Sequence, residues 1–251
     1  MLTCILGREG SPKSVLLRKR LGEAHARGIP CMMIVPEQYT LQAELDLLAQ
    51  LKLDGLLNIE VLSFSRLAHR VFSLSGGPKN TVIDMLGRAM LVRKALFELE
   101  KQNAFCARSA DRPGFATSIT DTLSELKAFG VTPELLIQAA AGDDRNGERL
   151  RALAEVYSRV ELAMAGQFSD GEDLLDLLAQ KLPQTGLFQQ ARVFIDGFEF
   201  LSGKWMSVIE QLIRTCRGVD ITFCHPEGNE DDAWLFESEI SVYQAVRARA
   251  Y

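Results

Sequence analysis

The chain has 251 residues, which corresponds to between one and two domains at about 150 residues per domain. Hydrophobic residues make up 47% and charged residues 24%, values typical of a globular protein, so the composition excludes disorder as the main state. With 33 acidic and 28 basic residues the net charge is −5, which argues against a protein held on nucleic acid by overall charge and leaves room only for a local basic groove.

The first 75 residues alternate short apolar runs with amphipathic segments. The apolar runs predict buried strands, and the segments between them predict helices. Strands are predicted over 2–6, 31–35 and 59–62, and helices over 14–26, 40–51 and 64–74. Because strands that are apolar on both faces need a helical layer on each side, this alternation predicts a parallel sheet covered on both faces.

The middle of the chain, from Thr81 to about Leu182, carries no strand signal. Thr81 with Asp84 three residues later resembles a capping box, which predicts a helix start at this point. In a second helix, Ile119, Leu123 and Leu126 share one face. Helices are predicted over 81–103, after Pro113-Gly114, from Pro133, over 150–168 and over 173–182.

The α/β pattern then returns, with strands predicted over 193–195 and 219–224 and a helix over 204–216. The most economical architecture is one α/β domain, formed by residues 1–78 and 189–251, that is interrupted by an all-helical insertion over 79–188. The alternative is two separate α/β pieces, each of which would be too small to cover a sheet.

A phosphate-loop pattern follows the first predicted strand. The segment GREGSPKS from Gly7 to Ser14 matches Gly, any four residues, Gly, Lys, Ser/Thr, except that Pro12 stands at the second glycine. Proline has no N–H and a fixed φ, and Glu9 adds a negative charge, so ATP binding should be weakened. The candidate residues of this degenerate nucleotide site are Gly7, Gly10, Lys13 and Ser14. The alternative is an ordinary turn before a helix.

Asp196 ends the predicted strand over 193–195 and supplies the acidic group that such sites use to hold the Mg²⁺ shell. Ser14 and Asp196 would therefore bind Mg²⁺ if a nucleotide binds. Gly197 stands where an active ATPase has a glutamate that positions the attacking water. We therefore expect little ATP hydrolysis, and we assign no catalytic residue.

Three further segments carry a family resemblance. They are VPEQYTLQAE at 35–44, VLSFSRLA at 61–68 and IDGF at 195–198, with Gly114-Phe115 and Glu125-Leu126-Lys127 between the last two. Their combination, order and spacing resemble the N-terminal, helicase-like region of the AddB/RexB subunit of bacterial helicase–nucleases. The resemblance covers essentially the whole chain, and it is specific as a combination rather than motif by motif.

The resemblance implies a superfamily-1 helicase fold, in which a RecA-like P-loop domain (1A) carries a helical inserted subdomain (1B-like). It implies that the chain is a fragment of a longer subunit of an ATP-dependent helicase and exonuclease, a hydrolase of double-strand break repair and recombination. It also implies a heterodimer with an AddA/RexA-type helicase–nuclease subunit and the scanning of single-stranded DNA for a hotspot sequence. The family's nuclease domain and iron–sulfur cluster are expected only in a C-terminal part that these residues do not include.

Six residues are candidates for contact with single-stranded DNA because they follow strand ends or lie on the first turns of the next helix. They are Gln38, Thr40, Phe64, Arg66, His69 and Phe198. Amide and hydroxyl groups can bond base edges or phosphates, aromatic rings can stack on bases, and Arg66 with Arg70 can pair with phosphate. His69 stands where the family often has an aromatic residue. Phe200 follows the same strand end as Phe198. The alternatives are helix capping by Gln38 and Thr40, core packing of Phe64, Phe198 and Phe200, and a solvated face for the arginines.

Three functions therefore remain open. The first is a DNA-scanning helicase-like module with a degenerate nucleotide site. The second is a stand-alone P-loop NTPase or kinase, against which Pro12 and Gly197 count. The third is an interaction module whose helical middle docks a partner subunit, and this is compatible with the first.

The five cysteines, at positions 4, 31, 106, 216 and 224, include no CxxC pair and predict neither a disulfide framework nor a zinc site. Cys4, Cys31 and Cys224 lie in apolar runs and are expected to be buried free thiols in a reducing compartment. No apolar run reaches 18 residues and no signal peptide is evident. A cytoplasmic protein without a membrane partner is therefore expected.

Overall fold

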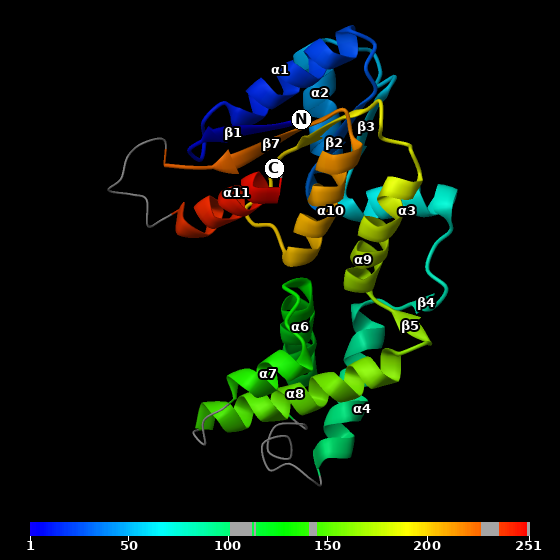
Figure 1. The fold of residues 1–251 in the computed structure, drawn as a ribbon, viewed down its shortest axis with the longest axis vertical. Coiled ribbons are helices and arrows are strands. Elements are labelled where there is room, and N and C mark those ends of the chain that lie inside the picture. Colours follow the sequence, from blue (N-terminus) through cyan, green and yellow to red (C-terminus); the bar gives the residue numbers. More distant parts are fainter. Residues whose placement is uncertain (101–111, 113, 141–144, 227–235, 250–251) are drawn as a thin grey trace. The chain divides into compact units, whose positions relative to one another are not determined.

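The computed structural model of the chain describes residues 1–100, 112, 114–140, 145–226 and 236–249 (Figure 1). It divides into two compact units. The first, here called the sheet unit, comprises Met1–Gly77 and Leu175–Tyr251, and the second, the helical unit, comprises Pro78–Leu174. The expected α/β class with a parallel sheet is confirmed, because every strand pair of the central five-stranded sheet is parallel.

The sheet unit contains the elements of both α/β segments of the sequence. Its strands are β1 (Leu2–Gly7), β2 (Cys31–Ile34), β3 (Ile59–Leu62), β6 (Arg192–Ile195) and β7 (Gly218–Cys224). Its helices are α1 (Lys13–Ala26), η1 (Glu37–Tyr39), α2 (Thr40–Leu51), α3 (Phe64–Ser75), η2 (Leu182–Gln184), α10 (Gly203–Thr215) and α11 (Glu237–Arg249). The helix α9 (Gly171–Lys181) begins in the helical unit and ends in the sheet unit.

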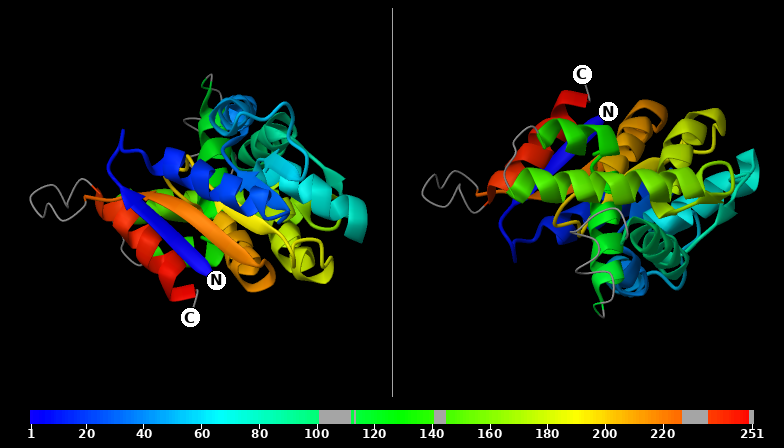
Figure 2. Two further views of the ribbon diagram at one scale, coloured as in Figure 1. Left: turned by 90° about the horizontal axis from the view of Figure 1, so that it is seen from above. Right: turned by 90° about the horizontal axis from the view of Figure 1, so that it is seen from below.

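The strands lie in the order β1-β7-β6-β2-β3, so the C-terminal strands β6 and β7 lie between the N-terminal strands β1 and β2. Parallel neighbours need crossover connections, and these are right-handed in nearly all proteins. The connections through α1 and α2 advance across the sheet in one direction, and the connection through α10 returns. Accordingly α1 and α2 cover one face, and α10 and α11 cover the other (Figures 1 and 2).

The core of the sheet unit is formed by central strands whose side chains are buried on both faces of the sheet. Met33 of β2 and Phe194 of β6 pack with Leu17 and Leu21 of α1 and with Leu47 of α2. Their strand neighbours, which point to the opposite face, are buried as well, and all four residues of β2 are inaccessible. This is the pattern that predicts a doubly covered parallel sheet, and the prediction is confirmed.

The helical unit is built from α4 (Met85–Glu100), α6 (Phe115–Ala128), α7 (Pro133–Ala139) and α8 (Arg145–Met164), with two short strands, β4 (Thr81–Val82) and β5 (Phe168–Ser169). Leu123 of α6 is buried in its core, and Ile119 and Leu126 pack against the same cluster, as their spacing predicts. Pro133 occupies the first turn of α7, where the side chain of Thr132 accepts a hydrogen bond from the Leu135 N–H, so the predicted helix start is confirmed.

Two predictions for the middle of the chain are wrong. The expectation of no strand between 81 and 182 is corrected by β4 and β5, which pair in parallel as a separate two-stranded sheet. The Thr81 N–H donates to the Gln167 carbonyl at 3.0 Å, so Thr81 belongs to this ladder and does not cap a helix. Asp84 accepts from the Gly87 N–H at 2.8 Å and caps α4 instead. The predicted helix over 150–168 ends at Met164, and the end predicted at residue 103 lies outside the described residues.

The four described cysteines are free thiols, and Cys106 lies outside the described residues. Of the three thiols expected to be buried only Cys31 is, whereas Cys4, on the edge strand β1, and Cys224, at the end of β7, are half-buried. Burial raises the pKa of both Cys31 and Cys216 to about 11, so both thiols are neutral near pH 7. None of the described helices has both the length and the apolar character needed to cross a bilayer.

A buried charge cluster holds the helical unit together. Asp170 accepts from Arg88 of α4 at 2.8 Å and from Lys127 of α6 at 3.0 Å, and all three side chains are less than 10% exposed. Lys127 also contacts Asp173 at 2.7 Å and Glu161 of α8 at 3.4 Å. Burial opposes the charge on Asp170, but Lys127 and Arg88 outweigh it and hold the pKa of this carboxyl below its ordinary value of 3.8. The cluster thereby ties three helices to the start of α9.

We expect Asp170→Asn to lower the free energy of unfolding by about 3–5 kcal/mol, because the change leaves two buried cations without their shared counter-charge. Urea unfolding at pH 7 measures this. The control is Glu98→Gln, which removes the half-exposed pairing of Glu98 with Arg159 at 3.4 Å and should cost less than about 1 kcal/mol. Equal losses in the two variants would contradict a special role for the buried cluster.

The same cluster predicts a pH dependence. Because the folded-state pKa of Asp170 lies below its ordinary value of 3.8, its contribution is fully present above about pH 4 and is lost as the pH falls through the folded-state pKa. Unfolding free energies measured from pH 7 down to pH 2 should therefore fall less steeply in Asp170→Asn than in the native chain. Parallel curves would show that Asp170 is not a source of the acid sensitivity.

Candidate functional site

The loop between β1 and α1 lies at the carboxyl edge of the sheet, where ligands bind in open α/β folds. Gly10 has φ +76°, a left-handed conformation that glycine adopts without strain. Pro12 is the N-cap of α1 and brings no side-chain hydrogen bond to the helix start. The Lys13 N–H donates to the Ser11 carbonyl at 2.8 Å. Neither position 12 nor position 13 therefore offers a free N–H to a phosphate, which weakens the anion cradle of a helix N-terminus.

The structure brings Ser14 and Asp196 into contact, although 182 positions separate them in the chain. The Ser14 Oγ donates to Asp196 Oδ1 at 3.0 Å, and the Thr222 Oγ1 donates to the same oxygen at 2.6 Å. Asp196 follows the last residue of β6 and is 6% exposed. A buried carboxylate needs such partners because it has lost its hydration. The hydroxyl and carboxylate expected to share a Mg²⁺ ion thus lie together, bonded to each other.

Lys13 is held inside the loop. Its Nζ donates to the Arg8 carbonyl at 2.7 Å and to the Cys224 Sγ at 3.5 Å. The Cys224 thiol in turn donates to Glu9 Oε2 at 3.3 Å. Burial raises the pKa of Cys224, and the hydrogen bond to Glu9 acts in the same direction, so the thiol stays protonated and serves as this donor. The ammonium group therefore lies within the candidate phosphate loop, close to a carboxylate.

A cleft of about 320 Å³ opens above these residues at the ends of β1, β2, β6 and β7. Its charged lining consists of four carboxylates and two cations, namely Glu9, Asp46, Asp196, Glu199, Lys13 and Arg18. Arg18 is already paired with Asp46 at 3.6 Å. The lining is therefore acidic, and a triphosphate would meet repulsion there unless a divalent cation came with it.

The residues fit Mg²⁺ only in part. Ser14 and Asp196 are suitable oxygen ligands, yet among the described residues no group of three or more His, Cys, Asp or Glu is placed to hold a metal ion. Gly197, at φ +80°, brings no carboxylate directly after Asp196. The nearest acidic side chain in the loop is Glu199, which lines the cleft.

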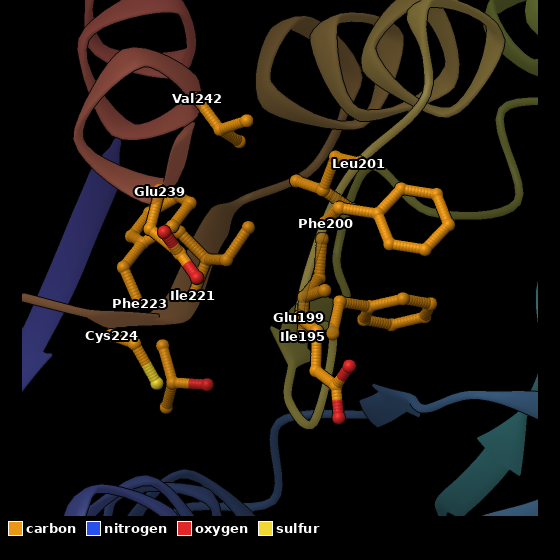
Figure 3. A pocket seen from close by; sticks show the side chains of 11 residues that line it. Ile195, Glu199, Phe200, Leu201, Ile221, Phe223, Cys224, Glu239 and Val242 are labelled. Atoms are coloured by element: carbon orange, nitrogen blue, oxygen red, sulfur yellow. The ribbon is translucent and has the colours of Figure 1, made fainter. Parts of the chain in front are cut away.

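A second, much smaller pocket lies beside the cleft, between the β6–α10 loop, β7 and α11 (Figure 3). Its volume is about 10 Å³, close to one water molecule. Phe198, Phe200, Ile221 and Phe223 contribute to an apolar lining. The pocket is too small for a nucleotide or a base, so we assign it no ligand.

The six candidate DNA-binding residues come from the ends of three adjacent strands, β6, β2 and β3. Gln38, Arg66 and His69 are exposed. Among the described residues Arg66 forms no ion pair, whereas Arg70 lies 3.5 Å from Glu60. These three exposed side chains provide amide, guanidinium and imidazole groups on the segments that follow the neighbouring strands β2 and β3.

Phe64 and Thr40 require a correction. Phe64 is 4% exposed, and its ring stacks on Trp205 with centroids 5.4 Å apart and also contacts Phe198 at 5.4 Å. It therefore has no face open to a base and belongs to the core alternative. Thr40 is 7% exposed, and its hydroxyl donates to the Glu37 carbonyl at 3.1 Å, so it serves the start of α2. The Phe64 ring and the Thr40 hydroxyl therefore both make their contacts within the protein.

Two residues near these groups, Thr222 and Trp205, are not among those that the sequence singles out. Thr222 bonds Asp196, Trp205 stacks on Phe64, and Phe200 stacks on Trp205 at 5.9 Å while remaining 57% exposed. The sequence places Phe200 with Phe198 after Asp196, and its exposed ring speaks against the core alternative for this residue. Trp205 lies inside a predicted helix and carries no separate signal.

Comparisons with known proteins give one consistent result. A model of the family described as "ADDB, N-terminal" matches residues 4–251.

Curated proteins named as the B-type subunit of an ATP-dependent helicase/deoxyribonuclease match as well. The one from Geobacillus kaustophilus is 33% identical over 266 residues, covering 99% of this chain and 23% of the relative. The one from Acetivibrio thermocellus is 32% identical over 254 residues, covering 98% and 22%. The one from Desulforamulus reducens is 36% identical over 233 residues, covering 89% and 20%. The chain thus spans about a fifth of the length of these curated relatives.

The aromatic cluster predicts a stability effect. Phe64→Ala should lower the free energy of unfolding by about 3–5 kcal/mol, the usual cost of truncating a buried phenylalanine. Urea unfolding measures it. Phe200→Ala, which removes an exposed ring of the same cluster, is the matched control and should cost clearly less. A loss below about 1 kcal/mol for Phe64→Ala would show that the ring is not part of the core.

Proposed function

The chain belongs to the family of ADDB N-terminal regions, and we propose that it is a helicase-like module that scans single-stranded DNA and carries a degenerate nucleotide site. The observation that carries the proposal is the carboxyl edge of the sheet, where Gln38, Arg66 and His69 are exposed after β2 and β3 and where Ser14, at the start of α1, bonds Asp196. In this proposal residues 1–78 and 189–251 form a RecA-like P-loop domain, and residues 79–188 are its inserted subdomain.

The DNA-binding part rests on the chemistry of the exposed edge. Guanidinium pairs with phosphate, while amide and imidazole groups bond base edges or stack on bases. Phe198 is only partly buried and Phe200 is exposed, so aromatic surface lies near these groups. Since the net charge is −5, overall charge gives little help and affinity should be modest.

The nucleotide part rests on three departures from an active site. Pro12 lacks an N–H, the Lys13 N–H is bonded within the loop, and no glutamate follows Asp196. The acidic cleft adds repulsion for phosphate. These features favour weak, Mg²⁺-dependent ATP binding without hydrolysis, in which Ser14 and Asp196 would hold the ion and Lys13 would approach the phosphates.

The relatives are named as subunits of an ATP-dependent helicase/deoxyribonuclease. By extension we propose that this chain acts within such a complex, in the repair and recombination of double-strand breaks, and pairs with an AddA/RexA-type subunit. A stand-alone P-loop NTPase or kinase is the second candidate, since the contact between Ser14 and Asp196 would serve that function equally. Turnover measurements separate the two.

We predict steady-state ATP turnover below about 1 s⁻¹, the low end of ordinary enzyme rates. A faster rate would favour the NTPase alternative. Pro12→Gly restores an N–H to the loop and should tighten ATP–Mg²⁺ binding roughly tenfold, the effect of one charge-assisted hydrogen bond. Titration with a fluorescent ATP analogue measures this. The double variant Pro12→Gly/Lys13→Ala is the control and should lose the gain, because the cation is removed.

We also predict that Arg66→Ala weakens binding of single-stranded DNA and lowers the slope of log K against log salt by about 0.7, the value expected for one phosphate contact on a single strand. Arg70→Ala, four residues along the same helix and paired with Glu60, is the matched control and should change the slope less. Fluorescence anisotropy at several salt concentrations measures both. Identical slopes in the native chain and in Arg66→Ala would place the DNA elsewhere.

A further inference from the structure

The helix α4 of the helical unit carries large apolar side chains on two faces, about 130° apart around its axis. One face packs into the core of the unit through Val92, Leu96 and Leu99, each 2% exposed or less. The other carries large apolar side chains in solvent: Leu86 is 71%, Met90 68% and Phe97 68% exposed. An apolar helix face is normally buried against another element. Half of α4 is covered by the helical unit, and the other half is not.

The three exposed side chains form one stripe. At 3.6 residues per turn, positions 86, 90 and 97 lie within about 40° of one another around the helix axis. Arg93 and Lys94 are exposed between them, and neither forms an ion pair with any residue that the structure describes. The surface is therefore a run of leucine, methionine and phenylalanine beside two available cations, here called the α4 stripe. Exposed apolar surface rimmed by charge marks interaction sites.

The composition of the α4 stripe selects among possible occupants. A second copy of the chain would bring the same cations of both molecules together in a two-fold contact, so like charges would oppose it. A nucleic acid would use aromatic rings, and only Phe97 of the three has one. Leucine and methionine instead pack against apolar side chains of a helix, and methionine adapts to varied partners.

We propose that the α4 stripe is a docking site for an amphipathic helix of the partner subunit, whose apolar side chains cover Leu86, Met90 and Phe97 and whose acidic side chains pair with Arg93 and Lys94. The proposal rests on the proposed function, which supplies the AddA/RexA-type subunit as the partner. Since a stable interface buries about 800 Å² on each side, the stripe would be the apolar centre of a larger contact. The proposal assigns a surface of the helical unit to assembly with a partner. The candidate phosphate loop and the candidate DNA-binding residues belong to the sheet unit.

The test uses analytical ultracentrifugation to measure the affinity of the 251-residue chain for the purified partner. Met90→Glu/Phe97→Glu should weaken this affinity at least tenfold, because it places acidic groups where the acidic helix binds. Leu41→Glu changes an apolar side chain of similar exposure, 67%, on α2 of the sheet unit and should stay within about twofold. Melting temperatures of both variants should match the native chain, since all three positions are exposed.

A second variant keeps the proposal falsifiable if the first one unfolds. Arg93→Glu/Lys94→Glu should weaken partner binding severalfold and remove the salt dependence that the native pair shows. Unchanged partner affinity in either folded variant would overturn the proposal, as would a loss of self-association or of single-stranded DNA binding in place of partner binding. If the native chain binds no such partner, this inference and the proposed heterodimer both fail, whereas the ATP and DNA assays still decide the remaining function.

Discussion

Parallel pairing of the strands is the constraint on which the rest of this structure depends. Each connection between parallel neighbours must cross the sheet, so helices cover both faces and the central strands β2, β6 and β7 are buried from both sides. The same geometry sends all strand ends to one edge. There Ser14, after β1, meets Asp196, after β6, across the intervening strand β7, which contributes Thr222. The candidate site is therefore a consequence of the sheet order rather than of sequence proximity.

Much of this fold could be predicted because the local signals agree with the tertiary arrangement. Unbroken apolar runs such as CMMI at β2 admit only a doubly covered strand, and Pro133 after Thr132 marks a helix start by backbone chemistry alone. The pairing of β4 with β5 could not be predicted. Each has two residues and no period, and their hydrogen bonds join positions 81 and 168, so only the folded chain creates the signal. Thr81 resembles a helix cap in the sequence for this reason, although the ladder uses its N–H.

For the candidate site, the residues of the loop and the strand end could be proposed from the sequence, whereas the burial of the aromatic residues could not. The loop motif and the strand end identify Lys13, Ser14 and Asp196, because backbone chemistry at a helix start depends on local sequence. The burial of an individual aromatic ring, by contrast, does not depend on local sequence alone. Phe64 could equally have faced a base or the core, and the outcome is decided by Trp205, which lies 141 positions further along the chain and stacks on it. Composition supplied the types of side chain at the edge, whereas packing decided which of them remain accessible.

The hydrogen bonds of Asp196 also explain how the proposed nucleotide site stays folded without a ligand. A carboxylate that is 6% exposed would be costly if it relied on a metal ion for its counter-charge. Here two hydroxyl groups, from Ser14 and Thr222, donate to one oxygen and join α1, β6 and β7. A metal ion entering this position would have to compete with both hydroxyls for that oxygen. The hydrogen bonds that stabilise the fold at this position therefore also oppose metal binding there. This is consistent with a loop that is retained for its structural role rather than for ATP turnover.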